Sequence, residues 1–166
     1  MRGADAAHPQ VKQRDYYVDS EVGYQVKGFA EEAMGEFSQL SVNNVFRPFA
    51  SYQISTGNTR AKGLSRHQAG FAVDFNGVKT LSKADLKKLN ELAKSFGLAP
   101  LATQSADPPH FDSDPTKHGY DSLKDAVGED KTHYDNIQAG KAEPVKYDEK
   151  KYEETKKKAD EKQKQP

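Results

Sequence analysis

The most informative part of the sequence is one short stretch, Ser65-Arg66-His67-Gln68-Ala69-Gly70-Phe71-Ala72-Val73-Asp74. It puts a histidine, His67, and a carboxylate, Asp74, at the two ends of a turn followed by a strand. A fully extended chain would hold these side chains roughly 23 Å apart, whereas two ligands of one metal ion must lie close together because each bond is about 2 Å long. A shared metal site therefore requires the chain to reverse between them. Gly70 allows this reversal, because glycine adopts positive φ without steric cost.

A second stretch, Asp107-Pro108-Pro109-His110-Phe111-Asp112, holds another histidine and two carboxylates. Two consecutive prolines favour polyproline II geometry, which repeats every three residues and puts Asp107 and His110 on one side, about 9 Å apart along the chain. That spacing suits a carboxylate that acts through a metal-bound water. Asp112 lies two residues after His110, on the same face of a strand, and is a rival for either carboxylate role.

These stretches resemble the motifs of the zinc-dependent D-Ala-D-Ala carboxypeptidase and L-alanyl-D-glutamate peptidase family, which includes VanX-type dipeptidases and phage endolysins. The first motif, Ser-x-His-x-x-Gly-x-Ala-x-Asp, is matched at every fixed position, and Asp-x-x-His follows. The resemblance covers about residues 43 to 112. It implies that His67, Asp74 and His110 hold Zn2+ and leave a fourth position open for water. Taken singly, the three residues also fit structural roles: a surface loop residue, a strand-end cap and a partly buried aromatic.

The resemblance also implies roles for residues around the metal. Asp107 stands where an acidic residue, Glu in many relatives, takes a proton from the zinc-bound water and later gives it to the leaving amine. Arg47 resembles the arginine that faces the substrate, and its planar fork suits a carboxylate or a polarised carbonyl oxygen. Ser65 is expected to support the site or the substrate. Gln53 and Arg60 are weaker candidates for the wall of the substrate cleft.

The composition limits the classes of protein that the chain can form. Its 166 residues are enough for one domain, but the hydrophobic content of 34% and the charged content of 30% indicate that part of the chain is not packed. The formal net charge is +0, so nothing in it favours nucleic-acid binding. The absence of cysteine excludes thiolate zinc ligands, thiol nucleophiles and disulfides. Neither a membrane-spanning run nor a signal peptide is visible.

Apolar periodicity predicts an α+β fold, with a small, mainly antiparallel sheet flanked by helices. The resemblance implies that this fold is similar to that of the Hedgehog signalling domain and the D-Ala-D-Ala peptidases. Ser82 is expected to cap the second helix and Gly97 to end it. A further one or two short helices are expected between Thr116 and Ile137. The remaining expected elements are a helix at 20–40 and strands at 42–52, 71–75, 98–104 and 109–111.

Three regions are expected along the chain: a loosely ordered arm at 1–20, a zinc peptidase domain at 21–138 and a charged tail at 139–166. The tail holds many lysines and glutamates and almost no aliphatic residues. Such a segment buries too little surface to offset the loss of chain entropy on folding. Paired charges four residues apart allow a solvated helix, but a flexible tail or linker is favoured.

The function implied by the resemblance is hydrolysis of an amide bond in the peptidoglycan stem peptide, by an endopeptidase of the L-alanyl-D-glutamate or related type. A D,D- or L,D-carboxypeptidase that trims terminal D-Ala is the alternative within the family. A non-catalytic, zinc-stabilised binding module, as in the Hedgehog domain, is the alternative of another class. We expect a monomer that acts on peptidoglycan stem peptides in the cell envelope, either as a secreted protein or as a phage-encoded lysin.

Overall fold

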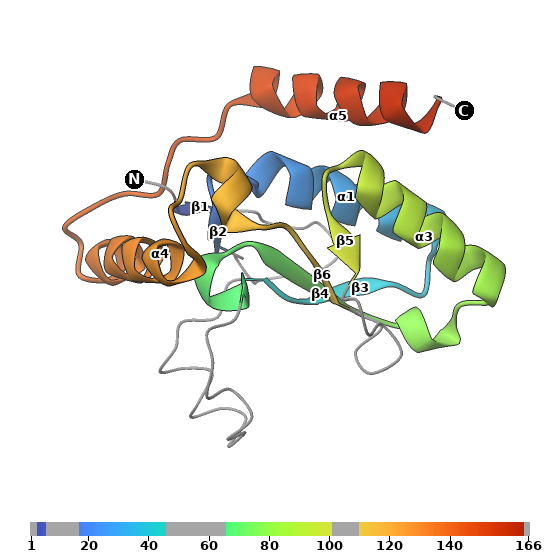
Figure 1. Cartoon of the computed structure of the whole chain (residues 1–166), viewed down its shortest axis with the longest axis horizontal. Helices are drawn as coiled ribbons and strands as arrows, with labels where there is room; N and C mark the ends of the chain where they lie inside the picture. Colours follow the sequence, from blue (N-terminus) through green and yellow to red (C-terminus); the bar gives the residue numbers. More distant parts are fainter. Residues whose placement is uncertain (1–2, 6–16, 46–65, 101–109, 165–166) are drawn as a thin grey trace.

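The computed structural model describes residues 3–5, 17–45, 66–100 and 110–164, and every structural statement below concerns these residues. They form an α+β fold with a four-stranded antiparallel sheet and four α-helices in the described part of the chain (Figure 1). This confirms the predicted fold class. The strands of the sheet, in spatial order, are β3 (Ser41–Asn44), β4 (Ala72–Asn76), β6 (His110–Asp112) and β5 (Ala99–Pro100).

Four α-helices and three short 3-10 helices accompany the sheet within the described ranges of the chain. The capping of the second long helix agrees with the sequence, because the Ser82 hydroxyl accepts a hydrogen bond from the Asp85 amide at 3.1 Å and Gly97 follows with a φ of +77°. No helix among the described residues is both long and apolar enough to cross a membrane. The helices are α1 (Gly23–Glu36), η1 (Arg66–Ala69), η2 (Val78–Thr80), α3 (Lys83–Ser95), η3 (Pro115–His118), α4 (Leu123–Gln138) and α5 (Glu149–Gln163).

The core lies where α1 covers the two central strands. Phe29 of α1 is fully buried, and its ring packs edge-on against Phe75 of β4 at 5.5 Å and Phe111 of β6 at 5.1 Å between centroids. Edge-to-face packing of this kind is a favourable arrangement of aromatic rings. Helix α1 therefore packs against both β4 and β6 and holds these two strands together.

The N-terminal arm is more ordered than the sequence suggested. Strand β1 (Gly3–Asp5) pairs antiparallel with β2 (Tyr17–Asp19). Val18 and Asp19 are buried, and the Asp19 amide donates a hydrogen bond to the Gly70 carbonyl at 3.0 Å. The expectation of a loosely held arm is wrong for residues 17–19, because so short a buried strand leaves no periodic signal in the sequence.

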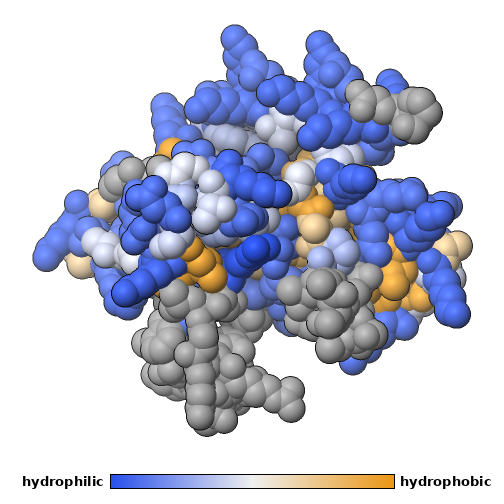
Figure 2. Space-filling model, viewed as in Figure 1, coloured by the Kyte–Doolittle hydropathy of each residue, from blue (hydrophilic) through white to orange (hydrophobic). Residues whose placement is uncertain are grey.

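The C-terminal segment also differs from the expected flexible tail. Helix α5 packs across α1 and α3 (Figure 1). Tyr152 and Ala159, seven residues apart, are its two buried residues, and the Tyr152 hydroxyl donates a hydrogen bond to the Glu31 carboxylate of α1. Figure 2 shows hydrophilic side chains over the rest of this helix. A contact face of two residues is enough to dock the helix, although its composition resembles that of a disordered segment.

Replacing Tyr152 with alanine is expected to lower the free energy of unfolding by about 2–4 kcal/mol, because the change removes a buried ring and leaves a cavity between α5 and α1. Urea unfolding measures this loss. Lys157→Ala is the control, because Lys157 is exposed on the same helix, so its removal should cost less than about 1 kcal/mol. Equal, small losses for the two variants would show that α5 does not stabilise the fold.

Candidate metal centre

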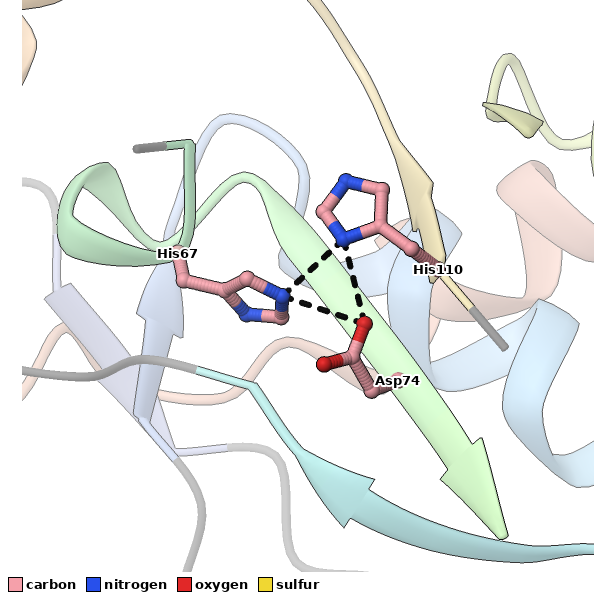
Figure 3. A group of neighbouring side chains, drawn as sticks. All are labelled: His67, Asp74 and His110. Carbon is pink, nitrogen blue, oxygen red and sulfur yellow. Dashed lines mark hydrogen bonds and ion pairs between the residues drawn. The ribbon is translucent and has the colours of Figure 1, made fainter. Parts of the chain in front are cut away.

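Three side chains meet on one face of the sheet: His67 from η1, Asp74 from β4 and His110 from β6 (Figure 3). The His67 Nε2 and His110 Nδ1 atoms each lie 3.1 Å from the Asp74 Oδ1 atom, and 3.1 Å from each other. Both histidines are buried, and the Asp74 side chain is 13% exposed. The structure thus brings together the three metal ligands that the resemblance implied.

The backbone explains how residues so far apart in the chain converge. Gly70 has a φ of +71°, and a Cβ atom built there would lie 2.6 Å from the Asp19 amide nitrogen. The chain therefore reverses at the residue that the sequence indicated, and β2 approaches it too closely for any side chain. Asp74 and His110 are directly opposite each other in the ladder between β4 and β6. Directly opposite residues of antiparallel strands project from the same face of a sheet.

Hydrogen bonds fix which ring atoms face the centre. His67 Nδ1 lies 2.7 Å from the Val45 carbonyl oxygen, and His110 Nε2 lies 2.7 Å from the Asp112 carboxylate. Both partners accept hydrogen bonds, so these ring nitrogens carry the hydrogen and the nitrogens that face the centre present lone pairs when the rings are neutral. Two lone pairs and a carboxylate oxygen that face one another repel unless a proton or a metal ion lies between them.

The dimensions of this triangle fit a metal ion. In a tetrahedral site with bonds of about 2.0–2.1 Å, neighbouring ligand atoms lie about 3.3–3.4 Å apart. The observed separations of 3.1 Å are close to that value. Two imidazoles and one carboxylate suit zinc, but they also suit other first-row transition ions. The buried group could therefore hold a metal ion whose identity the ligands alone do not decide.

The pKa values of Asp74 and His110 show that the group favours a positive charge beside the Asp74 carboxylate. Burial alone would raise the pKa of Asp74, but hydrogen bonds to His110 and His67, with their charges, hold it well below its usual value. Burial alone would lower the pKa of His110, but hydrogen bonds to Asp112 and Asp74 raise it to about 9. In the metal-free protein a proton on His110 therefore balances the Asp74 charge, and a metal ion would replace that proton.

The other residues that the sequence singled out are not placed by the structure. Asp107, Arg47, Ser65, Gln53 and Arg60 lie outside the described residues. Their roles around the centre remain predictions from the sequence.

Two contacts near the centre were not anticipated. Asp112 was a rival for a carboxylate role at the metal, but its carboxylate binds the ring nitrogen of His110 that faces away from the centre. Its other oxygen binds Arg66, at 2.7 Å from the Nη1 atom. The alternation of side chains along a strand indicated that Asp112 shares a face with His110, but no sequence signal marked Arg66 as its partner.

Helix α4 supports the turn that carries His67, because it packs directly against η1. Helix α4 also carries Asp130, which forms a buried carboxyl pair with Asp19 of β2, and the Tyr120 hydroxyl donates a hydrogen bond to Asp19. Burial and the neighbouring Asp19 raise the pKa of Asp130 far above its usual value. Asp130 is therefore protonated in the folded protein at neutral pH and ionised in the unfolded chain.

This buried proton predicts a pH effect for Asp130→Asn. The folded-state pKa of Asp130 is raised, so its contribution to stability is present below the unfolded pKa, near 4, and is lost as pH rises. Asparagine does not ionise, and its amide can still donate to Asp19. We expect the variant to gain stability over the wild type between pH 5 and pH 8, by up to about 1.4 kcal/mol per pH unit.

Urea unfolding at several pH values tests this prediction. Asp135→Asn on the same helix is the matched control, because the Asp135 side chain is 55% exposed and should show no such trend. A stability difference between Asp130→Asn and the wild type that does not change with pH would contradict the assignment.

In comparisons with known proteins, no protein-family model and no curated protein sequence matched the chain. The fold and the site together define the chain as an α+β protein with a candidate metal centre of two histidines and one aspartate.

Proposed function

We propose that the chain is a zinc-dependent peptidase that hydrolyses an amide bond in the peptidoglycan stem peptide, as an endopeptidase of the L-alanyl-D-glutamate or related type. The buried triangle of His67, Asp74 and His110 is the observation that carries this proposal, because its three protein ligands match those of catalytic rather than structural zinc sites. The substrate class comes from the resemblance of the two motifs. An enzyme with such a substrate would act in the cell envelope, either as a secreted enzyme or as a phage-encoded lysin.

The residues of the chain divide the chemistry between them. Bound zinc would lower the pKa of a water molecule towards about 7 and polarise the scissile carbonyl. His67, Asp74 and His110 would hold the ion in place. Asp107 would accept the proton of the water and deliver it to the leaving amine, and Arg47 would stabilise the negative charge that develops on the carbonyl oxygen.

Digestion of purified peptidoglycan with the zinc-loaded protein, followed by mass spectrometry of the muropeptides, tests the proposal. Cleavage between L-Ala and D-Glu is the expected result, and loss of a terminal D-Ala would instead indicate a carboxypeptidase. Removal of zinc with a chelator should abolish either product, and zinc should restore it.

The variant Asp107→Asn separates catalysis from metal binding. It is expected to keep zinc and to lose hydrolysis by about 100-fold or more, because a general base contributes about 10²–10⁴-fold to such a reaction. Asp135→Asn, an exposed carboxylate on α4, should keep both properties. A wild-type protein that binds zinc and cleaves no peptidoglycan would overturn the proposal and favour a non-catalytic binding module.

A further inference from the structure

One ion pair connects the two elements that carry the histidines of the metal centre. The Arg66 Nη1 atom lies 2.7 Å from Asp112 Oδ1, and Asp112 Oδ2 lies 2.7 Å from Nε2 of His110. Arg66 is the residue before His67 in η1, whereas Asp112 follows His110 by two residues in β6. A continuous chain of contacts therefore runs from the turn of one histidine to the ring of the other.

The carboxylate of Asp112 is placed to act on His110 and not on the metal. It is nearly buried, with a side chain 8% exposed, and each of its oxygens has a different partner. A carboxylate that accepts the far N–H of a metal-binding histidine fixes the ring orientation and increases the basicity of the nitrogen that faces the metal. Arg66 in turn balances the buried charge of Asp112, which would otherwise be costly.

We propose that Arg66 and Asp112 form a clamp that positions both histidines for the metal before the metal arrives. Asp112 keeps the Nδ1 atom of His110 pointed at Asp74, and Arg66 ties this arrangement to the turn of His67. Both are positioning residues, because neither contacts the centre itself. The inference rests on the metal centre of the proposed function but not on its hydrolytic activity.

Zinc affinity, measured by competition with a chromophoric chelator, tests the clamp. Asp112→Asn is expected to weaken zinc binding by about 10- to 100-fold, as loss of such an outer partner typically does. Arg66→Gln should weaken binding less, because the Arg66 side chain is 37% exposed and its ion pair is partly screened by solvent. Arg66→Lys, which keeps the charge, should recover part of that loss. Asp135→Asn, which breaks an exposed ion pair with Lys131, should bind zinc as the wild type does.

A double variant and a second probe distinguish positioning from a general loss of stability. If Arg66 acts through Asp112, the variant Arg66→Gln/Asp112→Asn should bind zinc no more weakly than Asp112→Asn alone. The visible absorption spectrum of the Co2+-loaded protein should change in Asp112→Asn and stay unchanged in Asp135→Asn, because it reports ligand geometry. Circular dichroism confirms that each variant is folded, and Arg66→Gln carries the test if Asp112→Asn does not fold.

The possible failures of the clamp and of the proposed function are distinct. Wild-type affinity and an unchanged Co2+ spectrum in folded Asp112→Asn, or in folded Arg66→Gln where that variant carries the test, would overturn the clamp and leave the metal centre standing. A wild-type protein that binds no metal would overturn both. Tight zinc binding that weakens as expected in the variants, without any cleavage of peptidoglycan, would support the clamp and overturn only the proposed function.

Discussion

Replacing Asp74 with asparagine is expected to weaken zinc binding by roughly 30- to 5,000-fold, which corresponds to the roughly 2–5 kcal/mol lost when one member of a buried charge pair is removed. Asp74 is the anionic member of the triangle, and its Oδ1 atom lies 3.1 Å from both histidine nitrogens. Asparagine has the same size but no charge to balance the ion. Isothermal titration with Zn2+ at neutral pH measures the change.

The control for this experiment is Asp135→Asn, which removes an exposed carboxylate and should leave the affinity unchanged. Circular dichroism of the metal-free variant shows whether it is folded. Tight zinc binding by folded Asp74→Asn would mean that the ion does not use the triangle, and the proposed function would lose the observation that carries it.

The second large effect is expected for Phe29→Ala, which should lower the free energy of unfolding by about 3–5 kcal/mol. The Phe29 ring fills the space behind β4 and β6, against Phe75 and Phe111. These two residues directly follow the candidate ligands Asp74 and His110 in the sequence. We therefore expect the variant to bind zinc more weakly as well, because the strands that present the ligands lose their support.

Urea unfolding followed by circular dichroism measures the loss of stability. Phe29→Leu is the matched control, because a leucine refills most of the space and should cost distinctly less than alanine. A loss below about 1 kcal/mol for Phe29→Ala would show that α1 contributes little to the sheet.

The resemblance of the two motifs indicated which three residues meet, and the geometry of a shared metal ion indicated that the chain must reverse between two of them. His67 and Asp74 can share an ion only if the chain reverses between them, and Gly70 is the residue there that permits it. The cap at Ser82 was predictable for a similar reason, since it depends on neighbours in the sequence. Features that are decided by local geometry leave a readable local pattern.

Features that are decided by distant partners did not leave such a pattern. Helix α5 is docked by Tyr152 and Ala159, and the surfaces that receive them belong to α1 and α3. The local composition therefore resembled that of a flexible tail. In the same way, the strand spacing put Asp112 beside His110, but it did not reveal whether the carboxylate would reach the metal or the far side of the ring.

Helix α4 shows a third limit of prediction from the sequence. The sequence predicted one or two short helices between Thr116 and Ile137, whereas the structure has the short 3-10 helix η3 at Pro115–His118 and one long α-helix at Leu123–Gln138. Asp130 and His133 belong to its buried face, together with Ala126 and Val127. A face that includes charged and polar residues does not appear in a search for apolar periodicity.

Asp74 and His110 lie directly opposite each other in the ladder between β4 and β6. This arrangement has a consequence for how the two strands align during folding. A slip of one residue between these strands would turn His110 to the other side of the sheet, away from its two partners. Only correctly aligned β4 and β6 strands would then allow all three side chains to bind the ion. Metal binding would thus favour the correct alignment of β4 with β6 as the protein folds, in addition to any role of the metal in catalysis.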